Sequence, residues 1–491
     1  MKRIIEEKEN NLAEEELDTL EEMEQEQEQN TTELLDLVKS KKVDKLRDFV
    51  SEHSPIDIAY MLNELEDDID IVFLFKAVQN DITAEIFSYL DHEQKEKIVK
   101  AFSSKEVRDL IDKMATDDLV DFVEELPSNL VNKVISNASQ EDRKEINAFL
   151  NYKEDSAGSI MTTEYVEIKE HITCKEALKR IKSVGKEAET IYTTFVVDSS
   201  RKLVGALYLD DLIFADDKTL VDDIMNDDYI SVSVDVDQEN VALLMKKYDI
   251  TTIPVVNKDD RLLGIITIDD IMDVIEQEQT EDLQKMAATT PIEGDYSKTS
   301  VFKLAWARVP WLLFLMLSAT LTGIILNIFE TALQVLPVLT LFIPMLMDTG
   351  GNAGGQTTTI VTRSLALGQI KVRDFLKVVF KEFRIGLIVG LCVAIVNFGW
   401  IFIELHFGIF QFDPASNANN PDWLVALLVA LTSYCVIVLS KTIGSCLPLF
   451  AKLIHLDPAI MAGPLVTTIV DACSLAVYLL LSSLILNGVS L

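Results

Sequence analysis

An acidic residue lies near the middle of the last apolar segment of this chain. Asp471 stands in the run Thr-Thr-Ile-Val-Asp-Ala-Cys-Ser, inside a stretch long enough to cross a lipid bilayer. A single carboxylate at that depth costs roughly 2.5–3.5 kcal/mol on insertion scales, so such residues generally face a water-filled cavity or a cation. We therefore predict that Asp471 belongs to an ion or solute pathway.

A second unusual stretch, from Pro344 to Gln356, places polar residues and glycines inside another apolar run. Lipid offers no hydrogen bonds to a broken helix, so such a stretch persists at membrane depth only inside protein or beside water. Glycines also let neighbouring helices approach closely, and tight helix packing alone is the alternative reading of these residues. The glycines that we assign to the pathway are Gly350, Gly351 and Gly354.

The 491 residues divide into an acidic half and a nearly neutral, apolar half. Residues 301–491 hold 10 Lys/Arg and 9 Asp/Glu, which leaves 34 and 71 of the totals of 44 and 80 for the residues before them. The first half therefore carries −37 and the second +1. This excess of carboxylates favours multivalent cations over nucleic acid as partners, although a solvated acidic surface is an alternative. Residues 1–30 are predicted to be an acidic, disordered tail.

Several classes of function lack their motifs. The five cysteines form no Cys-x-x-Cys pair, so neither a disulfide framework nor a zinc site is predicted. The five histidines do not pair at ligand spacing, and no phosphate-cradling loop or Gly-x-Ser-x-Gly is present. We expect neither an enzyme nor an ATP-driven pump. The charged N-terminus has no apolar signal-peptide core, so the first half is expected to stay in the cytoplasm.

Residues 31–150 show the periodicity of short helices, and we expect a superhelical, acidic N domain there. Its most informative helix begins at Thr116 and ends before Pro127. Carboxylates recur on one face of this helix at i, i+4 and i+7, namely Asp117, Asp121 and Glu124. A divalent cation would relieve their mutual repulsion, whereas the alternative is an ordinary solvated face.

An internal repeat occupies residues 151–276. Ser159-Ile-Met161 and Asp223-Ile-Met225 match at a spacing of 64, and the segments that begin at Leu203 and Leu262 match at 59. Each copy reads as helix, strand, turn, strand and helix. The two copies, 151–217 and 218–276, resemble a tandem pair of CBS modules. The resemblance implies one α/β unit.

Some CBS pairs bind adenine nucleotides through a hydroxyl residue and a carboxylate three positions later. Thr267 and Asp270 match that pattern, so ATP or another adenine nucleotide is a candidate ligand. The alternative is that Thr267 ends a strand and Asp270 caps the next helix. That helix repeats the acidic i, i+4, i+7 pattern with Asp269, Asp273 and Glu276. Two acidic stripes on separate domains favour bridging by a hard cation.

Residues 277–300 are predicted to form a connecting helix, and residues 301–491 an all-α transmembrane domain of five helices. The expected spans are 309–329, 333–362, 385–403, 423–450 and 458–486. The loop between the second and third spans is rich in Lys and Arg, whereas the next loop has none. By the positive-inside rule, the N-terminal half is cytoplasmic and the C-terminus outside. Lys441 is expected to extend its amine towards the cytoplasmic interface.

The order of acidic helical domain, CBS pair, connecting helix and five spans resembles the MgtE family of magnesium channels or transporters. The motifs that carry the resemblance are Tyr152 to Gly158, Ile160 to Thr163, Pro344 to Gln356, and Leu456 to Asp471. Gly355 departs from the polar residue expected in many relatives. The resemblance implies a homodimer that takes up Mg²⁺ across the cell membrane and is closed by internal Mg²⁺ at the acidic domains.

Magnesium chemistry agrees with this interpretation. Mg²⁺ prefers six oxygens and releases its waters reluctantly, so one or two carboxylates beside a hydrated pore suit it. We expect Asp471 and Asn352 to contact the hydrated ion. Two alternatives are a broader divalent-cation transporter and a membrane-tethered metal or adenylate sensor without transport. The sensor does not explain a carboxylate at mid-membrane.

Overall fold

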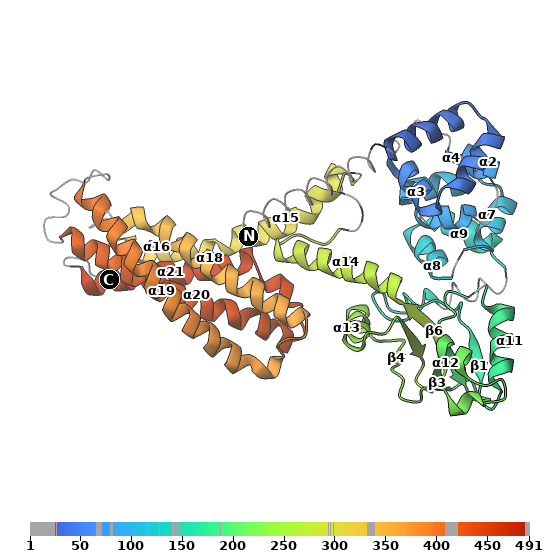
Figure 1. The fold of residues 1–491 in the computed structure, drawn as a ribbon. Helices are drawn as coiled ribbons and strands as arrows, with labels where there is room; N and C mark the ends of the chain where they lie inside the picture. The colour runs from blue at the N-terminus through green and yellow to red at the C-terminus, as the bar shows by residue number, and fades with distance from the viewer. Residues whose placement is uncertain are drawn as a thin grey trace, which may run out of the picture. The chain divides into compact units, whose positions relative to one another are not determined.

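The computed structural model divides the chain into two units, Met1–Val274 and Ile275–Leu491, and Figure 1 labels most of their helices and strands. Each unit is described by itself. The described residues are 25 and 27–486, except 65–70, 79–81, 115, 127, 140–142, 144–145, 147–148, 187, 293, 295, 298, 331–338 and 408–420. The acidic tail that was predicted for residues 1–30 thus lies almost wholly outside the described residues.

Short helices build the first part of unit 1. They are α2 (Val43–Glu52), α3 (Pro55–Glu64), α4 (Ile71–Val78), α5 (Ile82–Ser88), α6 (His92–Ala101), α7 (Ser104–Ile111), α8 (Thr116–Glu125) and α9 (Ser128–Asn137). Their apolar faces share one core, in which the rings of Phe87 and Phe122 pack edge to face with centroids 4.9 Å apart. Ser103 caps the start of α7 and forms a capping box with Glu106.

Two similar α/β modules follow. The first contains β1 (Glu167–Lys169), α11 (Cys174–Val184), β2 (Thr193–Val197), β3 (Leu203–Tyr208), α12 (Leu209–Phe214) and η1 (Val221–Asp223). The second contains β4 (Val232–Ser233), α13 (Gln238–Tyr248), β5 (Thr252–Val256), β6 (Leu262–Thr267) and the start of α14 (Ile268–Met286). In each module the middle strand pairs in parallel with the first strand and antiparallel with the third.

The repeat extends to an irregularity of the sheets. The register shifts between Val196 and Val197 in the first module and between Val255 and Val256 in the second. Apolar residues of both modules also form one buried cluster, which includes Phe195 and Ile265. The predicted α/β pair is therefore confirmed, although each module has a third strand, β1 or β4, that was not predicted.

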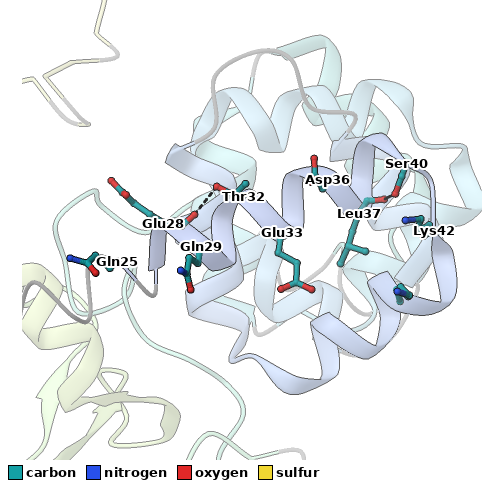
Figure 2. A pocket seen from close by; sticks show the side chains of 10 residues that line it. Gln25, Glu28, Gln29, Thr32, Glu33, Asp36, Leu37, Ser40 and Lys42 are labelled. Atoms are coloured by element: carbon teal, nitrogen blue, oxygen red, sulfur yellow. Dashed lines mark hydrogen bonds between the residues drawn. The ribbon is translucent and has the colours of Figure 1, made fainter.

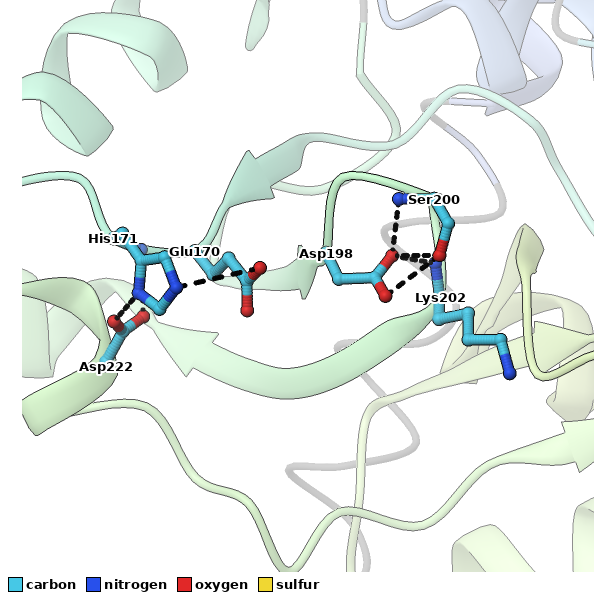
Figure 3. Close-up of polar contacts among 6 residues, drawn as sticks. All are labelled: Glu170, His171, Asp198, Ser200, Lys202 and Asp222. Carbon is cyan, nitrogen blue, oxygen red and sulfur yellow. Dashed lines mark hydrogen bonds and ion pairs between the residues drawn. The ribbon is translucent and has the colours of Figure 1, made fainter.

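Turns of the first module are held by side-chain contacts that Figure 3 shows. His171, in a left-handed conformation, donates its backbone N–H to Asp222 (3.0 Å) and pairs its ring with the same carboxylate. That side-chain hydrogen bond raises the pKa of the His171 ring. Asp198 accepts the backbone N–H groups of Ser200 (2.7 Å) and Lys202 (2.8 Å). These contacts tie turns together and are surface features.

Unit 2 begins within α14, which is helical only to Met286, so the predicted connecting helix is shorter than residues 277–300. Its further helices are α15 (Val301–Ser318), α16 (Thr320–Ile328), α18 (Leu339–Ala366), η2 (Val372–Asp374), α19 (Phe375–His406), α20 (Asp422–Leu453), η3 (Pro458–Met461) and α21 (Pro464–Ile485). The α20 helix packs against α18, α19 and α21, which Figure 1 draws as neighbouring rods.

Among the described residues, four segments are long and apolar enough to cross a membrane. They are Val301–Ile328, Val372–His406, Asp422–Leu453 and Pro458–Ile485. The second of the five predicted spans corresponds to α18, whose polar residues and glycines lower its mean hydropathy. The first residues of that predicted span, 333–338, lie outside the described parts. The first span begins at Val301, eight residues before the predicted start, because helix formation starts at the Ser300 cap.

Candidate ion pathway and regulatory sites

Asp471 is positioned by α21, whose first residue is Pro464, a favourable residue for a first turn. Its side chain is half-buried, and its Oδ1 atom is buried without a hydrogen-bond partner among the described residues. The carboxylate lies over Gly351 of α18, because a Cβ at that glycine would be 3.7 Å from Asp471 Oδ1. A buried carboxylate oxygen without a partner is costly, and a cation or its water would remove that cost.

Asn352 lies on the solvent-exposed side of α18. Its Nδ2 donates a hydrogen bond to Asp348 Oδ2, one turn earlier, at 3.1 Å. Asp348, Asn352 and Gln356 are all exposed and recur at i, i+4 and i+8, so α18 carries a polar stripe. Asp348 also acts electrostatically on Asp471. Asp348 was not among the predicted site residues, although its spacing of four from Asn352 places both on one face of a helix.

The three glycines that were assigned to the pathway lie where α18 meets its neighbours. A Cβ on Gly350 would approach Ser474 Oγ to 2.6 Å, and one on Gly351 would approach Thr467 Cγ2 to 2.8 Å, both on α21. Gly354 faces Val470 at 3.2 Å. These glycines therefore permit close contact between α18 and α21. Tight helix packing, the alternative role of the glycines, is thus present in the structure.

The prediction that Lys441 extends towards the membrane interface is wrong. Lys441 on α20 is only 5% exposed, and its Nζ lies 3.3 Å from Thr357 Oγ1 of α18. The Thr357 hydroxyl in turn donates to Glu382 Oε2 of α19 at 3.0 Å. The physical reason is close helix packing, since Gly386 lets α19 lie directly against Lys441. The amine is thus held inside the bundle by a relay that ends on a carboxylate.

The end of α14 contacts the segment before α21, within unit 2. Lys285 Nζ forms ion pairs with Glu281 (2.5 Å) and with Asp457 (2.7 Å). Burial, followed by the charge of Asp457, raises the pKa of Asp282. Gly463 has a positive φ of 54°, and a Cβ there would lie 2.1 Å from the Met286 carbonyl oxygen. Only glycine fits this contact, which joins the connecting helix to the membrane helices.

The acidic stripe that was predicted on α8 remains a prediction. The backbone of α8 is described, but the side chains of Asp117, Asp121 and Glu124 lie outside the described parts. On α14, Asp269, Asp273 and Glu276 are exposed, as predicted for a solvated or ion-binding face. Within the described residues, no group of three or more His, Cys, Asp or Glu is arranged to hold a metal ion.

Other carboxylates of unit 1 interact with one another. Glu189 lies at the surface, yet nearby protein removes part of its solvent. That desolvation, followed by the charges of Asp269, Asp270 and Asp118, raises the pKa of Glu189. Burial likewise raises the pKa of Asp270, with contributions from Asp269 and Asp118. We call Asp118, Glu189, Asp269 and Asp270 the acidic cluster. Asp118 and Glu189 were not among the predicted site residues, because no local pattern joins segments this far apart in the sequence.

Thr267 and Asp270, the predicted nucleotide contacts, bind each other. Thr267 Oγ1 donates to Asp270 Oδ2 at 2.7 Å, and the Thr267 backbone N–H lies 3.4 Å from the same oxygen. This arrangement agrees with the alternative, in which Asp270 caps the start of α14. A cleft of about 640 Å³ opens elsewhere in the pair, and Thr267 and Asp270 do not line it. Its lining includes Tyr192, Tyr208 and Tyr248.

A further hollow, of about 630 Å³, follows the helical residues 27–39. Figure 2 shows Glu28, Glu33 and Asp36 along it, with Lys42 at one end. Thr32 Oγ1 donates to the Glu28 carbonyl at 2.8 Å, an ordinary contact within a helix. Its lining holds both acidic and basic side chains, and we assign no ligand to it.

Comparison with known proteins defines the class of protein. Residues 343–481 match a family described as a divalent cation transporter, residues 53–155 match the MgtE intracellular N domain, and residues 157–218 and 221–277 match the CBS domain. The chain is thus a membrane transporter whose apolar helices follow a cytosolic N domain and a CBS pair.

Individual relatives then define the family. The magnesium transporter MgtE of Thermus thermophilus is 33% identical over 447 residues, which cover 90% of this chain and 96% of that protein. The magnesium transporter MgtE of Bacillus subtilis is 32% identical, with 88% and 93% covered. The chain belongs to the MgtE family of magnesium transporters. It is therefore a transporter and not an enzyme.

One solved structure is also similar to part of the chain. It is the cytosolic domain of the Mg²⁺ channel MgtE in complex with ATP, which is 33% identical and has a TM-score of 0.47. This chain covers 99% of that structure, and the match covers 50% of this chain.

Proposed function

We propose that this chain mediates Mg²⁺ uptake across the cell membrane. The observation that carries the proposal is Asp471, a carboxylate within a membrane-length helix whose buried Oδ1 has no hydrogen-bond partner among the described residues and lies over Gly351 of α18. Mg²⁺ keeps most of its waters, so it needs a few oxygen acceptors around a wet path rather than a closed cage. Asp471 supplies charge, and the Asn352 amide orients the waters of the ion.

Magnesium flux into liposomes tests this proposal. The full chain is purified, inserted into liposomes that contain a Mg²⁺-sensitive dye, and exposed to an inward Mg²⁺ gradient. Dye signal that rises with the gradient supports the transporter. A folded protein without any flux would favour the alternative of a metal or adenylate sensor. Parallel gradients of Mn²⁺, Co²⁺ and Ca²⁺ separate a magnesium-selective protein from a broader divalent-cation transporter.

The proposed arrangement is a homodimer with five spans in each chain. The span in addition to the four apolar segments is α18, the second in chain order, which is long enough to cross a bilayer although its polar stripe reduces its mean hydropathy. A stripe of exposed polar residues on such a helix needs protein or water against it, and a two-fold axis would bring two such stripes together. The basic loop after α18 supports a cytoplasmic N-terminal half and an outside C-terminus.

Closure by internal Mg²⁺ is the second part of the proposal. The acidic cluster repels itself, and a bound divalent cation would relieve that repulsion and favour a tighter cytosolic arrangement. The predicted stripes, Asp117, Asp121 and Glu124 together with Asp269, Asp273 and Glu276, extend the same charge. The α14 helix then transmits the change, because its end contacts the segment before α21. For this to act as regulation, Mg²⁺ must bind the closed arrangement more tightly than the open one.

Neutralising the acidic cluster is expected to weaken this inhibition. In the double variant Glu189→Gln/Asp269→Asn, the cytoplasmic Mg²⁺ concentration that halves uptake should rise about fivefold or more. A fivefold change is at the lower end of ordinary allosteric coupling, roughly fivefold to 150-fold. Uptake at low internal Mg²⁺ should stay unchanged. The matched control is Glu154→Gln/Asp259→Asn, which removes two exposed carboxylates outside the cluster. Equal shifts in both variants would contradict a specific role for the cluster.

An adenine nucleotide is a second proposed ligand, supported by the cleft beside Tyr192, Tyr208 and Tyr248. A volume of about 640 Å³ is ordinary for a small-molecule site, and aromatic rings provide stacking surfaces. Asp210 and Asp249 also line it and offer acceptors for ribose hydroxyls. This location differs from the contact predicted at Thr267 and Asp270.

Two variants separate these locations in an ATP titration of the full chain by calorimetry. Tyr192→Ala is expected to weaken ATP binding tenfold or more, because stacking of a base on an aromatic ring contributes roughly 1–3 kcal/mol. Thr267→Val should leave the affinity unchanged. The control is Tyr60→Ala, which removes an exposed ring of α3. The reverse pattern, with loss only in Thr267→Val, would return the site to the originally predicted residues.

A further inference from the structure

Asp348 is a charged group in the membrane unit that the proposed function does not use. It is the tenth residue of α18, about 14 Å along the helix from Leu339, so it does not sit at the helix end. Its side chain is exposed, and within the described residues it forms no ion pair with Lys or Arg. A carboxylate inside a membrane-length helix is costly, and the exposed stripe gives it a polar face.

Asp348 and Asp471 are carboxylates on two helices that pack against each other, and neither forms an ion pair with Lys or Arg among the described residues. Asp348 acts electrostatically on Asp471, and Asp471 Oδ1 is buried, without a hydrogen-bond partner in the described part of the chain, over Gly351, three residues after Asp348. The one Lys that is buried in this bundle among the described residues does not compensate them, because Lys441 is bound to Thr357 and, through it, to Glu382. Two negative charges on adjacent helices match one divalent cation.

Asn352 orients the Asp348 carboxylate. Its Nδ2 donates to Asp348 Oδ2, which holds one carboxylate oxygen along α18 and leaves the other free. The same bond uses an amide N–H, so the Asn352 carbonyl oxygen stays available to accept from a water. Both free oxygens are acceptors, which is what the outward-pointing hydrogens of metal-bound water require.

We propose that Asp348 is a second ion-contact carboxylate and determines the affinity and the divalent-over-monovalent preference of the pathway. Asp348 and Asp471 hold one hydrated divalent cation between α18 and α21, and Asn352 positions Asp348. This inference rests on the proposed function. With α18 running inwards, Asp348 lies on the outer side of Asn352 and meets an entering ion first. A doubly charged ion gains from both carboxylates, whereas a singly charged ion gains half as much from each.

The test measures initial Mg²⁺ uptake by the full chain in liposomes against external Mg²⁺, with and without competing Na⁺. The variant Asp348→Asn keeps the size of the side chain and the contact with Asn352 but removes the charge. The Mg²⁺ concentration that gives half-maximal uptake is expected to rise about tenfold or more, and Na⁺ should compete more strongly. Asp348→Glu restores the charge and should recover most of the affinity. The matched control, Asp422→Asn, removes a carboxylate at the start of α20 and should change half-saturation less than about twofold.

The outcomes are distinguishable. Uptake by Asp348→Asn with wild-type half-saturation and Na⁺ competition would overturn this inference alone, as would equal shifts in Asp348→Asn and Asp422→Asn. A wild-type protein without uptake would overturn the proposed function and this inference together. If Asp348→Asn does not fold, Asp348→Ser tests the same loss of charge with a smaller neutral side chain. Loss of maximal rate without any change in half-saturation would indicate a structural role and contradict the proposal.

Discussion

Replacement of Asp471 with alanine is expected to abolish magnesium uptake. The attraction between this carboxylate and a passing cation must at least offset the burial cost of the carboxylate, roughly 2.5–3.5 kcal/mol. Removal of that attraction should therefore lower the uptake rate at low Mg²⁺ by about a hundredfold or more. The variant should fold, because Oδ1 has no described partner to lose. Initial uptake into liposomes at low external Mg²⁺, corrected for the amount of inserted protein, measures the effect.

Two comparisons make this result specific. Asp471→Asn keeps the shape of the side chain and should fail nearly as completely, because the charge is what attracts the ion. Ser474→Ala, one turn later on α21, removes a buried hydroxyl that has no described partner and lies against Gly350. It should retain most of the uptake. Substantial flux through Asp471→Asn would show that charge at this position is not required, and the pathway would have to lie elsewhere.

The substitution Gly463→Ala is expected to make uptake largely insensitive to internal Mg²⁺. An alanine Cβ would lie 2.1 Å from the Met286 carbonyl oxygen, so the end of α14 cannot keep its contact with the segment before α21. If that contact belongs to the closed arrangement, as we propose, its loss shifts the equilibrium towards the open one. Uptake is measured at low and high Mg²⁺ inside the liposomes, and the ratio of the two rates should approach one.

Backbone strain has to be separated from the lost contact. Gly463 has a positive φ, and alanine at such a φ costs roughly 1–2 kcal/mol wherever it occurs. Gly368 also has a positive φ, but a Cβ there would meet nothing within 4 Å, so Gly368→Ala carries the strain without the clash. We expect normal inhibition in this control. Loss of inhibition in both variants would attribute the effect to destabilisation.

The sequence by itself determined the features that depend on neighbouring residues. The internal repeat predicted two strands in each CBS module, β2 and β3 and then β5 and β6, although it did not predict β1 and β4. Helical periodicity and turn residues predicted the helix that begins at Thr116. Membrane spans followed from long apolar runs, because bilayer thickness sets their length. Asp471 was visible for the same reason, since a carboxylate is conspicuous in such a run. Family membership also came from the order of linear motifs.

Only the tertiary structure decided which distant groups meet. Lys441 looked like a residue that reaches the interface, yet α18 and α19 enclose it. Asp348 approaches Asp471, and Gly463 meets Met286, across more than a hundred residues of chain. Glu189 likewise joins Asp269, and the open cleft lies beside Tyr192 rather than Thr267. Local patterns report which face of a helix is polar. They do not report which other face it meets, because that depends on the packing of all elements at once.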